Sequence, residues 1–266
     1  MHLHPFTLSF SGAPLQARFP FYFDGQRPEG ISCALSSRPA GSMAYSREDG
    51  GRERAVFFRS LGFDPEKVYS CAQVHSRDTA AVEPGTPNTR PRVDGLAASR
   101  DLLRGGTALS VTVADCLPVF LWDSEHGACA VLHSGWKGTG IARNALALMA
   151  ERWQTRPAAV AAVLGPCIRS CCYRVDGERA RVFEDEFGGH GGDYPLGPVV
   201  RKEPAPDENG FLWYLDLQAA NARILAAAGV RNLAYCEDCT FTDERLGSFR
   251  REGPEYTRMA AVIGYF

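Results

Sequence analysis

The chain has 266 residues, of which 45% are hydrophobic and 23% are charged, and its formal net charge is −2. This composition is typical of an ordinary folded globular protein, and the length is sufficient to bury a sizeable core. The charge lacks the basic excess that binding to phosphate backbones or anionic membranes requires, so we expect neither nucleic acid nor a membrane as a partner.

The amino terminus and the cysteines indicate the cellular compartment. Residues 1–6 contain no basic stretch followed by an apolar core, so we expect no secretory signal and a cytoplasmic protein. The weakly polar stretch over 106–122 is interrupted by Asp115 and Pro118 and is too short to span a bilayer comfortably. The nine cysteines are odd in number and several lie inside apolar runs, which favours buried free thiols over a disulfide framework.

The first half of the chain is predicted to be rich in strands. We expect a strand-rich stretch over about 5–37, a polar loop over 41–51 and a helix over about 52–62. Three short apolar runs then each end on a polar residue, and they are Val68–His75, Ala108–Cys116 and Ala128–His133. They are separated by a loop over 83–92 and a turn over 123–127. We predict that each run is a buried strand that delivers its last side chain to the edge of a sheet.

The second half mixes helices and strands. After His133 a glycine-rich loop leads to a helix near Thr139, whose apolar residues recur at helical spacing. The elements that follow are a strand over 158–164, a helix over 178–187, an exposed loop over 188–210, a helix from Asp216 to Gly229 and strands near 232–236 and 258–264. Without strict alternation, repeats or linkers, the pattern predicts one α/β or α+β domain spanning residues 1–266.

The polar residues that end the three runs form a candidate metal site. His75, Cys116 and His133 would supply two imidazoles and a thiolate, which is a good ligand set for zinc. Three protein ligands leave one tetrahedral position for water or substrate, as in catalytic zinc sites. An enzyme is therefore the leading interpretation.

Residues near these positions are candidates for further roles. Gln73 and Asp115 precede two of the proposed ligands and could orient an imidazole or hold a catalytic proton. Lys137, in the glycine-rich loop that opens the next helix, favours an anion at that helix terminus, although an ordinary strand-to-helix turn is an equal alternative. The pair Arg250-Arg251 could bind a phosphate or carboxylate, or be a solvated surface pair.

Several motifs together resemble the polyphenol oxidase or "laccase domain" family. They are Gln73-Val-His75, Asp94-Gly-Leu96, Thr112-Val-Ala-Asp-Cys-Leu-Pro-Val119, His133-Ser-Gly-Trp-Lys-Gly138, Gly165-Pro-Cys-Ile168 with Cys171-Cys-Tyr173, Cys239-Thr240 and Ser248-Phe-Arg-Arg251. The resemblance extends from about Phe23 to the end of the chain. It implies a four-layer α/β/β/α fold, in which two mixed sheets pack face to face between helices.

The resemblance also implies a site and an activity. His75, Cys116 and His133 occupy the zinc-ligand positions of the family, whose members resemble zinc-dependent purine nucleoside phosphorylases that also deaminate adenosine. The sequence departs from the family pattern at Ala44 and at Glu53, which precedes Arg54. These departures leave the metal site intact and put the usual substrate pocket in doubt.

The first functional hypothesis is therefore a zinc-dependent purine nucleoside phosphorylase that cleaves adenosine- or inosine-type nucleosides with phosphate and deaminates adenosine. Zinc would bind to His75, Cys116 and His133, and Asp115 or Gln73 would handle the proton. Arg54, Lys137 and Arg250 are the predicted substrate-binding residues, because a phosphate needs positive charge. The expected partners are a purine nucleoside and phosphate, and we expect a monomer.

Three alternatives stay open at this point. Copper could occupy the site and give polyphenol oxidase activity, although six histidines are few for an oxygen-reducing copper cluster. Cys116 could act as a nucleophile with His133 as its base, which suits a hydrolase that edits peptidoglycan precursors. A zinc-stabilised binding module would need four closed ligands, and Cys236-Glu-Asp-Cys239 is the only compact cysteine pair with suitable spacing.

Overall fold

The structure, a computed structural model, describes residues 1–45, 50–189 and 196–266. Parts of the predicted loops over 41–51 and 188–210, including His190, lie outside the described residues. The helices are α1 (Gly50–Ser60), α2 (Arg100–Arg104), α3 (Ile141–Trp153), α4 (Gly177–Phe187), α5 (Leu217–Ala227) and α6 (Phe249–Glu252). Short 3₁₀ helices cover Arg38–Ala40, Pro65–Lys67, Pro157–Ala159 and Gly253–Glu255.

Two large mixed sheets form the centre of the molecule. The six-stranded sheet has the order β2 (Phe10–Ser11), β3 (Gln16–Phe19), β4 (Ile31–Ser36), β16 (Met259–Tyr265), β8 (Ala108–Val113) and β5 (Val68–Ser70). The seven-stranded sheet has the order β1 (His2–Phe6), β15 (Asn232–Cys236), β11 (Val160–Leu164), β9 (Leu117–Asp123), β10 (Cys129–Ser134), β7 (Gly95–Ala98) and β6 (Thr79–Val82). Parallel pairing joins β5 to β8, β15 to both β1 and β11, and β6 to β7; the other neighbours are antiparallel.

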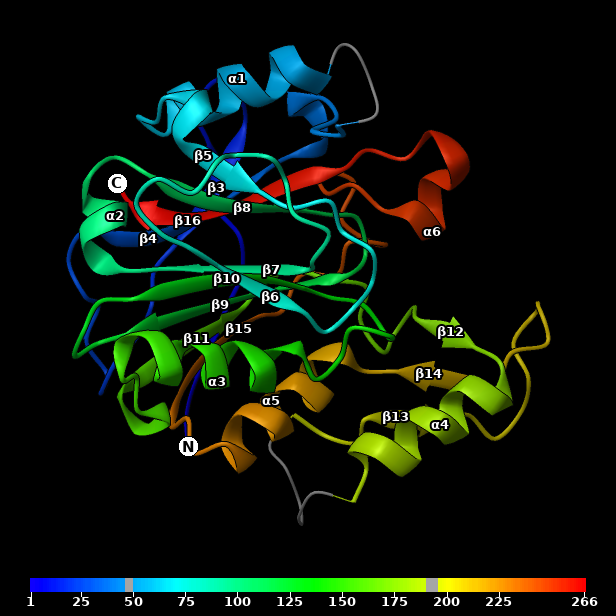
Figure 1. Cartoon of the computed structure of the whole chain (residues 1–266). Coiled ribbons are helices and arrows are strands. Elements are labelled where there is room, and N and C mark those ends of the chain that lie inside the picture. The colour runs from blue at the N-terminus through cyan, green and yellow to red at the C-terminus, as the bar shows by residue number, and fades with distance from the viewer. Residues whose placement is uncertain (46–49, 190–195) are drawn as a thin grey trace.

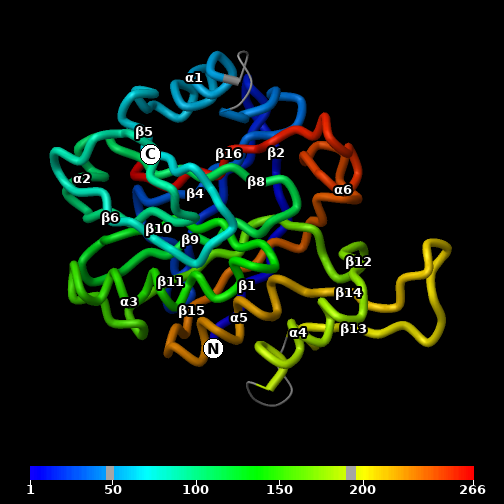
Figure 2. The backbone as a smooth tube through the Cα atoms, turned by 45° about the vertical axis from the view of Figure 1, so that its right-hand side comes forward, coloured from blue at the N-terminus to red at the C-terminus, as the bar shows by residue number. Residues whose placement is uncertain are grey.

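The elements stack in four layers, as Figure 1 shows: α1, the six-stranded sheet, the seven-stranded sheet, and the helices α3 and α5. A small sheet of β12 (Arg174–Val175), β14 (Trp213–Leu215) and β13 (Val200–Lys202) lies with α4 to one side of these layers (Figure 2). The α/β class and the α/β/β/α arrangement with two mixed sheets, which were expected from the family resemblance, are confirmed.

Burial on both faces explains why the central strands are almost continuously apolar. In β16, Ala260 and Val262 join the core beneath α1, whereas Ala261 and Ile263 join the core between the sheets. Successive side chains of a strand point to opposite faces, so a strand between two packed layers needs apolar residues at every position. In β10, Leu132 likewise packs against the outer helical layer.

Replacing Phe120 with Ala is expected to lower the free energy of unfolding by about 3–5 kcal/mol. The Phe120 side chain is fully buried between the sheets, and its ring and that of Phe19 form a T-shaped pair with a centroid distance of 5.6 Å. Chemical denaturation would measure the loss. Val182→Ala, on an exposed position of α4, is the control and should change stability little; equal losses in both variants would contradict this account of the core.

Two of the three predicted ligand-bearing strands are shorter than expected. β5 ends at Ser70 and β8 at Val113, so the predictions of strands reaching His75 and Cys116 are wrong. The physical reason is that His75 (φ 61°) and Asp115 (φ 86°) have left-handed backbone conformations, which interrupt an extended strand. His133 does lie in a strand, one residue before the end of β10.

Other element predictions had mixed outcomes. Asp216 caps α5 by accepting a hydrogen bond from the Ala219 N–H, as predicted, and Gly229 follows the helix with φ 98°. The predicted loop over 188–210 contains β13, and the short α2, which Ser99 caps, was not predicted. All nine cysteines are free; six are buried, as expected, whereas Cys116 and Cys172 are half-buried and Cys171 is exposed. None of the helices in the described ranges combines the length and hydropathy that a bilayer crossing requires.

Candidate metal centre and active-site pocket

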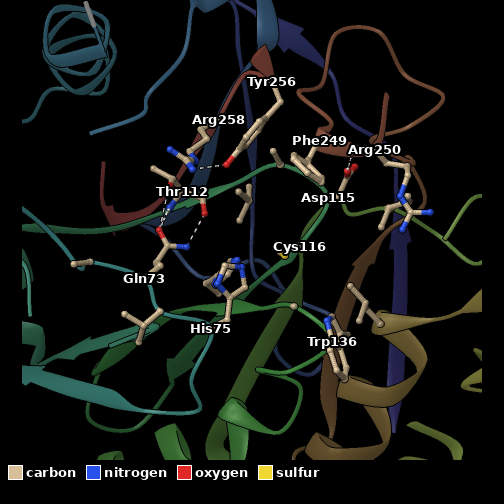
Figure 3. Close-up of a pocket in the computed structure, with 18 of the residues that line it drawn as sticks. Gln73, His75, Thr112, Asp115, Cys116, Trp136, Phe249, Arg250, Tyr256 and Arg258 are labelled. Carbon is tan, nitrogen blue, oxygen red and sulfur yellow. Dashed lines mark hydrogen bonds between the residues drawn. The ribbon is translucent and has the colours of Figure 1, made fainter. Parts of the chain in front are cut away.

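The side chains of His75, Cys116 and His133 converge at one edge of the two sheets. Figure 3 shows His75 and Cys116 close together at this edge. One ligand atom from each lies within 4.8 Å of the other two, and the imidazole rings are 5.1 Å apart between centroids. His75 follows β5 of the six-stranded sheet, and His133 belongs to β10 of the seven-stranded sheet. Cys116 lies where the chain crosses from β8 in one sheet to β9 in the other. The three predicted ligands therefore meet where the chain passes from one sheet to the other.

Asp94 holds the loop that carries His75. Its fully buried carboxylate accepts hydrogen bonds from the N–H groups of Val74, His75 and Ser76 at 3.1, 3.0 and 2.7 Å. The Ser76 hydroxyl also donates to it, at 2.9 Å. These contacts stabilise the left-handed conformation of His75, which is costly for a residue other than glycine.

Asp94 also orients the second histidine. The His133 Nδ1 lies 2.9 Å from Asp94 Oδ1, and both side chains are buried. When Nδ1–H donates to the carboxylate, Nε2 is left with a lone pair for a metal ion. In the sequence, Asp94 stands out only as part of the Asp94-Gly-Leu96 motif. Its role in holding both histidines depends on contacts between distant segments.

The charges of these residues are strongly coupled. Burial raises the pKa of Asp94, but hydrogen bonds from His133 and Ser76 outweigh burial and lower that pKa to about 2. Burial also disfavours the charged forms of Cys116 and His133. Their mutual attraction, with smaller contributions from His75 and Asp94, nevertheless lowers the pKa of Cys116 to about 6 and raises the pKa of His133 to about 9. Cys116 is thus favoured as a thiolate, the form in which cysteine binds metals.

The residues around this centre fit a zinc ion. Imidazole nitrogen and thiolate sulfur are common zinc ligands, and a carboxylate behind a ligating histidine is the usual support for it. Gly135 leaves the necessary space, because a Cβ atom at that position would lie 2.9 Å from Cys116 Sγ and 3.8 Å from His75 Cδ2. The close approach to the Cys116 sulfur favours glycine at this position, whereas the distance to His75 is an ordinary van der Waals contact.

Replacing Gly135 with Ala is therefore expected to weaken zinc affinity about tenfold, the scale of other changes next to metal ligands. The added methyl group must displace the Cys116 sulfur, while the fold stays intact. Competition with a chromophoric chelator would measure the affinity. Gly189→Ala is a suitable control, since a Cβ atom there meets nothing within 4 Å. Unchanged zinc affinity in Gly135→Ala would show that the Cys116 sulfur can move away from the added methyl group without loss of metal binding.

Asp115 supplies a carboxylate beside the metal centre. Its Oδ1 accepts a hydrogen bond from the Thr240 hydroxyl at 2.6 Å, and its Oδ2 accepts one from the Arg250 N–H at 2.7 Å. The backbone at Asp115 is left-handed, and its carbonyl accepts from the Ile168 N–H at 2.9 Å. Among the described residues that line the pocket, Asp115 is the only carboxylate.

Gln73 lies in the pocket wall with its amide engaged. The Nε2 group donates to the Thr112 carbonyl at 2.8 Å, and Oε1 accepts from the Thr112 N–H and hydroxyl, both at 2.8 Å (Figure 3). These bonds attach the loop of His75 to β8. They support a positioning role for Gln73 and leave Asp115 as the candidate for proton transfer.

Of the three predicted substrate-binding residues, the structure brings only Arg250 into the pocket. Arg54 donates to the Met43 and Ala44 carbonyls at 3.1 and 2.6 Å, and its guanidinium lies 3.7 Å from the centroid of the Tyr45 ring. Lys137 is exposed outside the pocket, with its Nζ 5.5 Å from the Trp136 ring centroid. Arg54 and Lys137 therefore do not line the cavity; they contact the lining residues Tyr45 and Trp136, respectively.

The pocket is a cavity of about 780 Å³ with aromatic and cationic walls. The aromatic residues are Tyr45, Trp136, Tyr173, Phe249 and Tyr256, and the arginines are Arg90, Arg92, Arg179, Arg250 and Arg258. Tyr256 and Arg258 lie on one side of His75 and Cys116, and Trp136 lies on the other (Figure 3). Most of these residues were missed from the sequence because they come from distant loops. Trp136, Tyr173, Phe249 and Arg250 were already part of the motifs that carry the family resemblance.

The fold and the centre define a class of protein. The sequence profile of the family described as "Multi-copper polyphenol oxidoreductase laccase" matches residues 40–265, and the chain belongs to this family. The resemblance found in the sequence motifs is thereby confirmed.

Three comparisons place the chain among known proteins. It is 32% identical to "Purine nucleoside phosphorylase YlmD" of Geobacillus stearothermophilus, over 77% of this chain and 74% of that protein. It is 29% identical to "Adenosine deaminase RL5" from an unknown prokaryotic organism, over 73% and 76%. The crystal structure of YlmD from Geobacillus stearothermophilus superimposes with a TM-score of 0.76 at 28% identity, covering 93% of this chain and 96% of that one. These relatives are named as enzymes, and the chain is an enzyme.

Proposed function

We propose that the protein is a zinc-dependent purine nucleoside phosphorylase that also deaminates adenosine. The observation that carries the proposal is the position of His75, Cys116 and His133 in a cavity with aromatic walls and several arginines. Relatives named for phosphorolysis and for adenosine deamination support both activities within one family. A cavity of about 780 Å³ is in the range of small-molecule sites and is large enough for a nucleoside and a phosphate.

The walls of the cavity suit the two halves of such a substrate pair. Aromatic rings offer flat apolar surfaces on which a purine base can stack. Arginine side chains bind phosphate oxygens through paired N–H donors. A zinc ion, when bound, supplies a Lewis acid that orients substrate oxygens and lowers the pKa of a bound water.

In phosphorolysis, phosphate attacks the anomeric carbon of the ribose as the bond to the purine breaks, which gives the free base and ribose 1-phosphate. Positive charge builds on the ribose in the transition state, and phosphate carries the compensating negative charge. Arg250 and the other arginines of the pocket would hold the phosphate in place for this attack. The proton that the departing base needs must come from a group in the pocket or from water.

In deamination, water replaces the amino group at C6 of adenosine, and inosine and ammonia are formed. A carboxylate must carry a proton from the attacking water to the leaving nitrogen. Asp115 is in the right place for this role, because it lies in the pocket next to Cys116 and is the only carboxylate among the described lining residues.

The test is product chromatography after zinc-loaded protein is incubated with adenosine and phosphate. We expect adenine with ribose 1-phosphate, and inosine, from the wild type and neither from His133→Ala. His126→Ala is the matched control, because His126 lies in a turn against Asp123, outside the pocket, and should leave both products unchanged. Intact adenosine with the wild type would refute the proposed activity.

A specific observation favours a second candidate, a metal-free thiol hydrolase acting on cell-wall precursors. Asp94, His133 and Cys116 form a carboxylate, imidazole and thiol series, which is the arrangement that activates a cysteine nucleophile. Removal of the metal separates the two candidates. Activity on peptidoglycan fragments that survives complete chelation would support the hydrolase, whereas activity that returns only with zinc would support the first proposal.

A copper oxidase, which the family description suggests, is supported less well by the histidines. In the described part of the chain, His75 and His133 are the only imidazoles in the pocket lining. His2 and His4 belong to β1, and His126 pairs with Asp123. An oxygen-reducing copper cluster needs several more imidazoles than this pocket offers. Parallel assays with zinc and copper loading would compare the two metals directly.

A further inference from the structure

A second group of metal-binding side chains lies outside the pocket. It consists of Cys171, Cys172 and Cys239, whose sulfur atoms all lie within 4.8 Å of one another. The Sγ atoms of Cys171 and Cys172 are 3.3 Å apart. Cys171 is exposed, Cys172 is half-buried and Cys239 is buried, so the group is reachable from solvent at one side. We refer to these three residues as the thiol cluster.

The fold brings the thiol cluster together through two parallel strands. β11 and β15 pair in parallel, so the segments that follow them leave the sheet at the same edge. Cys167 and Cys239 then form an isolated parallel bridge between these segments. A tight turn places Cys171 and Cys172 opposite Cys239, because the N–H groups of Cys172 and Tyr173 both donate to the Arg169 carbonyl at 2.8 Å.

The surroundings favour a bound cation. Cys171 and Cys239 line a second cavity of about 470 Å³, together with Glu237, Asp238 and Asp243. Glu237 and Asp238 add negative charge to this cavity, whereas Asp243 pairs with Arg245 at 2.8 Å. Within the cavity wall, the Arg169 N–H points at Cys239 Sγ at a distance of 3.4 Å, which stabilises negative charge on the sulfur.

The donor atoms decide which cation fits. Thiolates are soft ligands that select Cu(I) and zinc over magnesium, calcium or manganese. Zinc in a structural site almost always takes four protein ligands. Among the described residues this cluster offers three sulfur donors, which suits a soft cation that accepts three-coordination. One monovalent cation with three thiolates has a net negative charge. Arg169, which lines the same cavity, would partly offset this charge.

We propose that Cys171, Cys172 and Cys239 form a second metal site, selective for Cu(I), that is separate from the centre of His75, Cys116 and His133. No substrate chemistry is assigned to it, and it does not depend on the proposed nucleoside activity. Binding replaces the thiol protons by one metal ion and releases those protons to solvent, without any change of oxidation state.

The test is an anaerobic Cu(I) titration of reduced, metal-free, full-length protein in competition with a chromophoric Cu(I) chelator. The Cys116→Ser variant is used as the background, because it removes the thiolate of the first centre and leaves only its two imidazoles, which X-ray absorption distinguishes from sulfur neighbours. We expect one tightly bound equivalent and a thiolate-to-copper absorption band in the ultraviolet. X-ray absorption should show sulfur neighbours only.

Two further variants in the same background identify the ligands. Cys171→Ser, at an exposed position, should keep the fold and lose both the tight equivalent and the band, and Cys239→Ser should do the same. Cys33→Ser, in the buried core of β4, is the control and should retain them. Unchanged Cu(I) binding in Cys171→Ser would overturn the proposal. So would a disulfide within the thiol cluster that persists under reducing conditions, or tighter binding of zinc than of Cu(I).

Discussion

Replacing Asp94 with Asn is expected to weaken zinc binding about 10- to 100-fold. The buried carboxylate accepts hydrogen bonds from three successive N–H groups of the loop that carries His75, and it also pairs with His133. Asparagine has nearly the same size, but its NH₂ group cannot accept the hydrogen bonds that one carboxylate oxygen accepts now. Its neutral oxygen also attracts the His133 imidazole less strongly. Both histidines therefore lose orientation through a single substitution.

Competition with a chelator measures the zinc affinity of Asp94→Asn, and circular dichroism verifies its fold. Asp78→Asn is the matched control. Asp78 is exposed, and it follows His75 by three residues in the same chain segment. Wild-type zinc affinity in Asp94→Asn would mean that the ligands are held by the backbone alone.

Replacing Asp115 with Asn should separate the two proposed activities. We expect adenosine deamination to fall by about 10²- to 10⁴-fold, the usual contribution of general acid–base catalysis, while zinc content stays the same. The exchange is mild structurally, because asparagine tolerates the left-handed backbone of Asp115. Its oxygen can accept from the Arg250 N–H, and its NH₂ group can donate to the Thr240 hydroxyl, so both contacts survive in modified form.

Product chromatography distinguishes the outcomes of the Asp115→Asn experiment. Adenine and ribose 1-phosphate should still form, and inosine should disappear. Wild-type deamination would show that another group carries the proton. Loss of both activities together with zinc would show that Asp115 serves mainly to hold the loop between β8 and β9.

The features of the fold and of the site that depend on local sequence were predictable. His133 closes an apolar run that is a strand, and the Asp216 cap and Gly229 mark the ends of a helix as their chemistry predicts. The prediction that His75 and Cys116 lie close together is confirmed, and the prediction that they end strands is wrong. Their backbone is set by Asp94 and by the crossing between sheets, which are contacts that hydrophobic periodicity does not report.

The layering and the pocket walls were harder to derive. A strand buried on both faces has the same continuous apolar pattern whether its neighbours are helices or a second sheet, so the two facing sheets followed from the family resemblance alone. Arg90 and Arg258 are far apart in the chain and line one cavity. Nothing in the residues around either one indicates that partnership.

The crossing of the chain between β8 and β9 has a mechanical consequence. An ion held by His75, Cys116 and His133 would join the two sheets as a clasp, since its ligands come from both. Pulling the sheets apart would then require release of the ion. Ion binding to the folded state alone would add about 2.7 kcal/mol to its stability at a free concentration about 100 times the dissociation constant. The melting temperature of the protein would then report how much metal its surroundings supply.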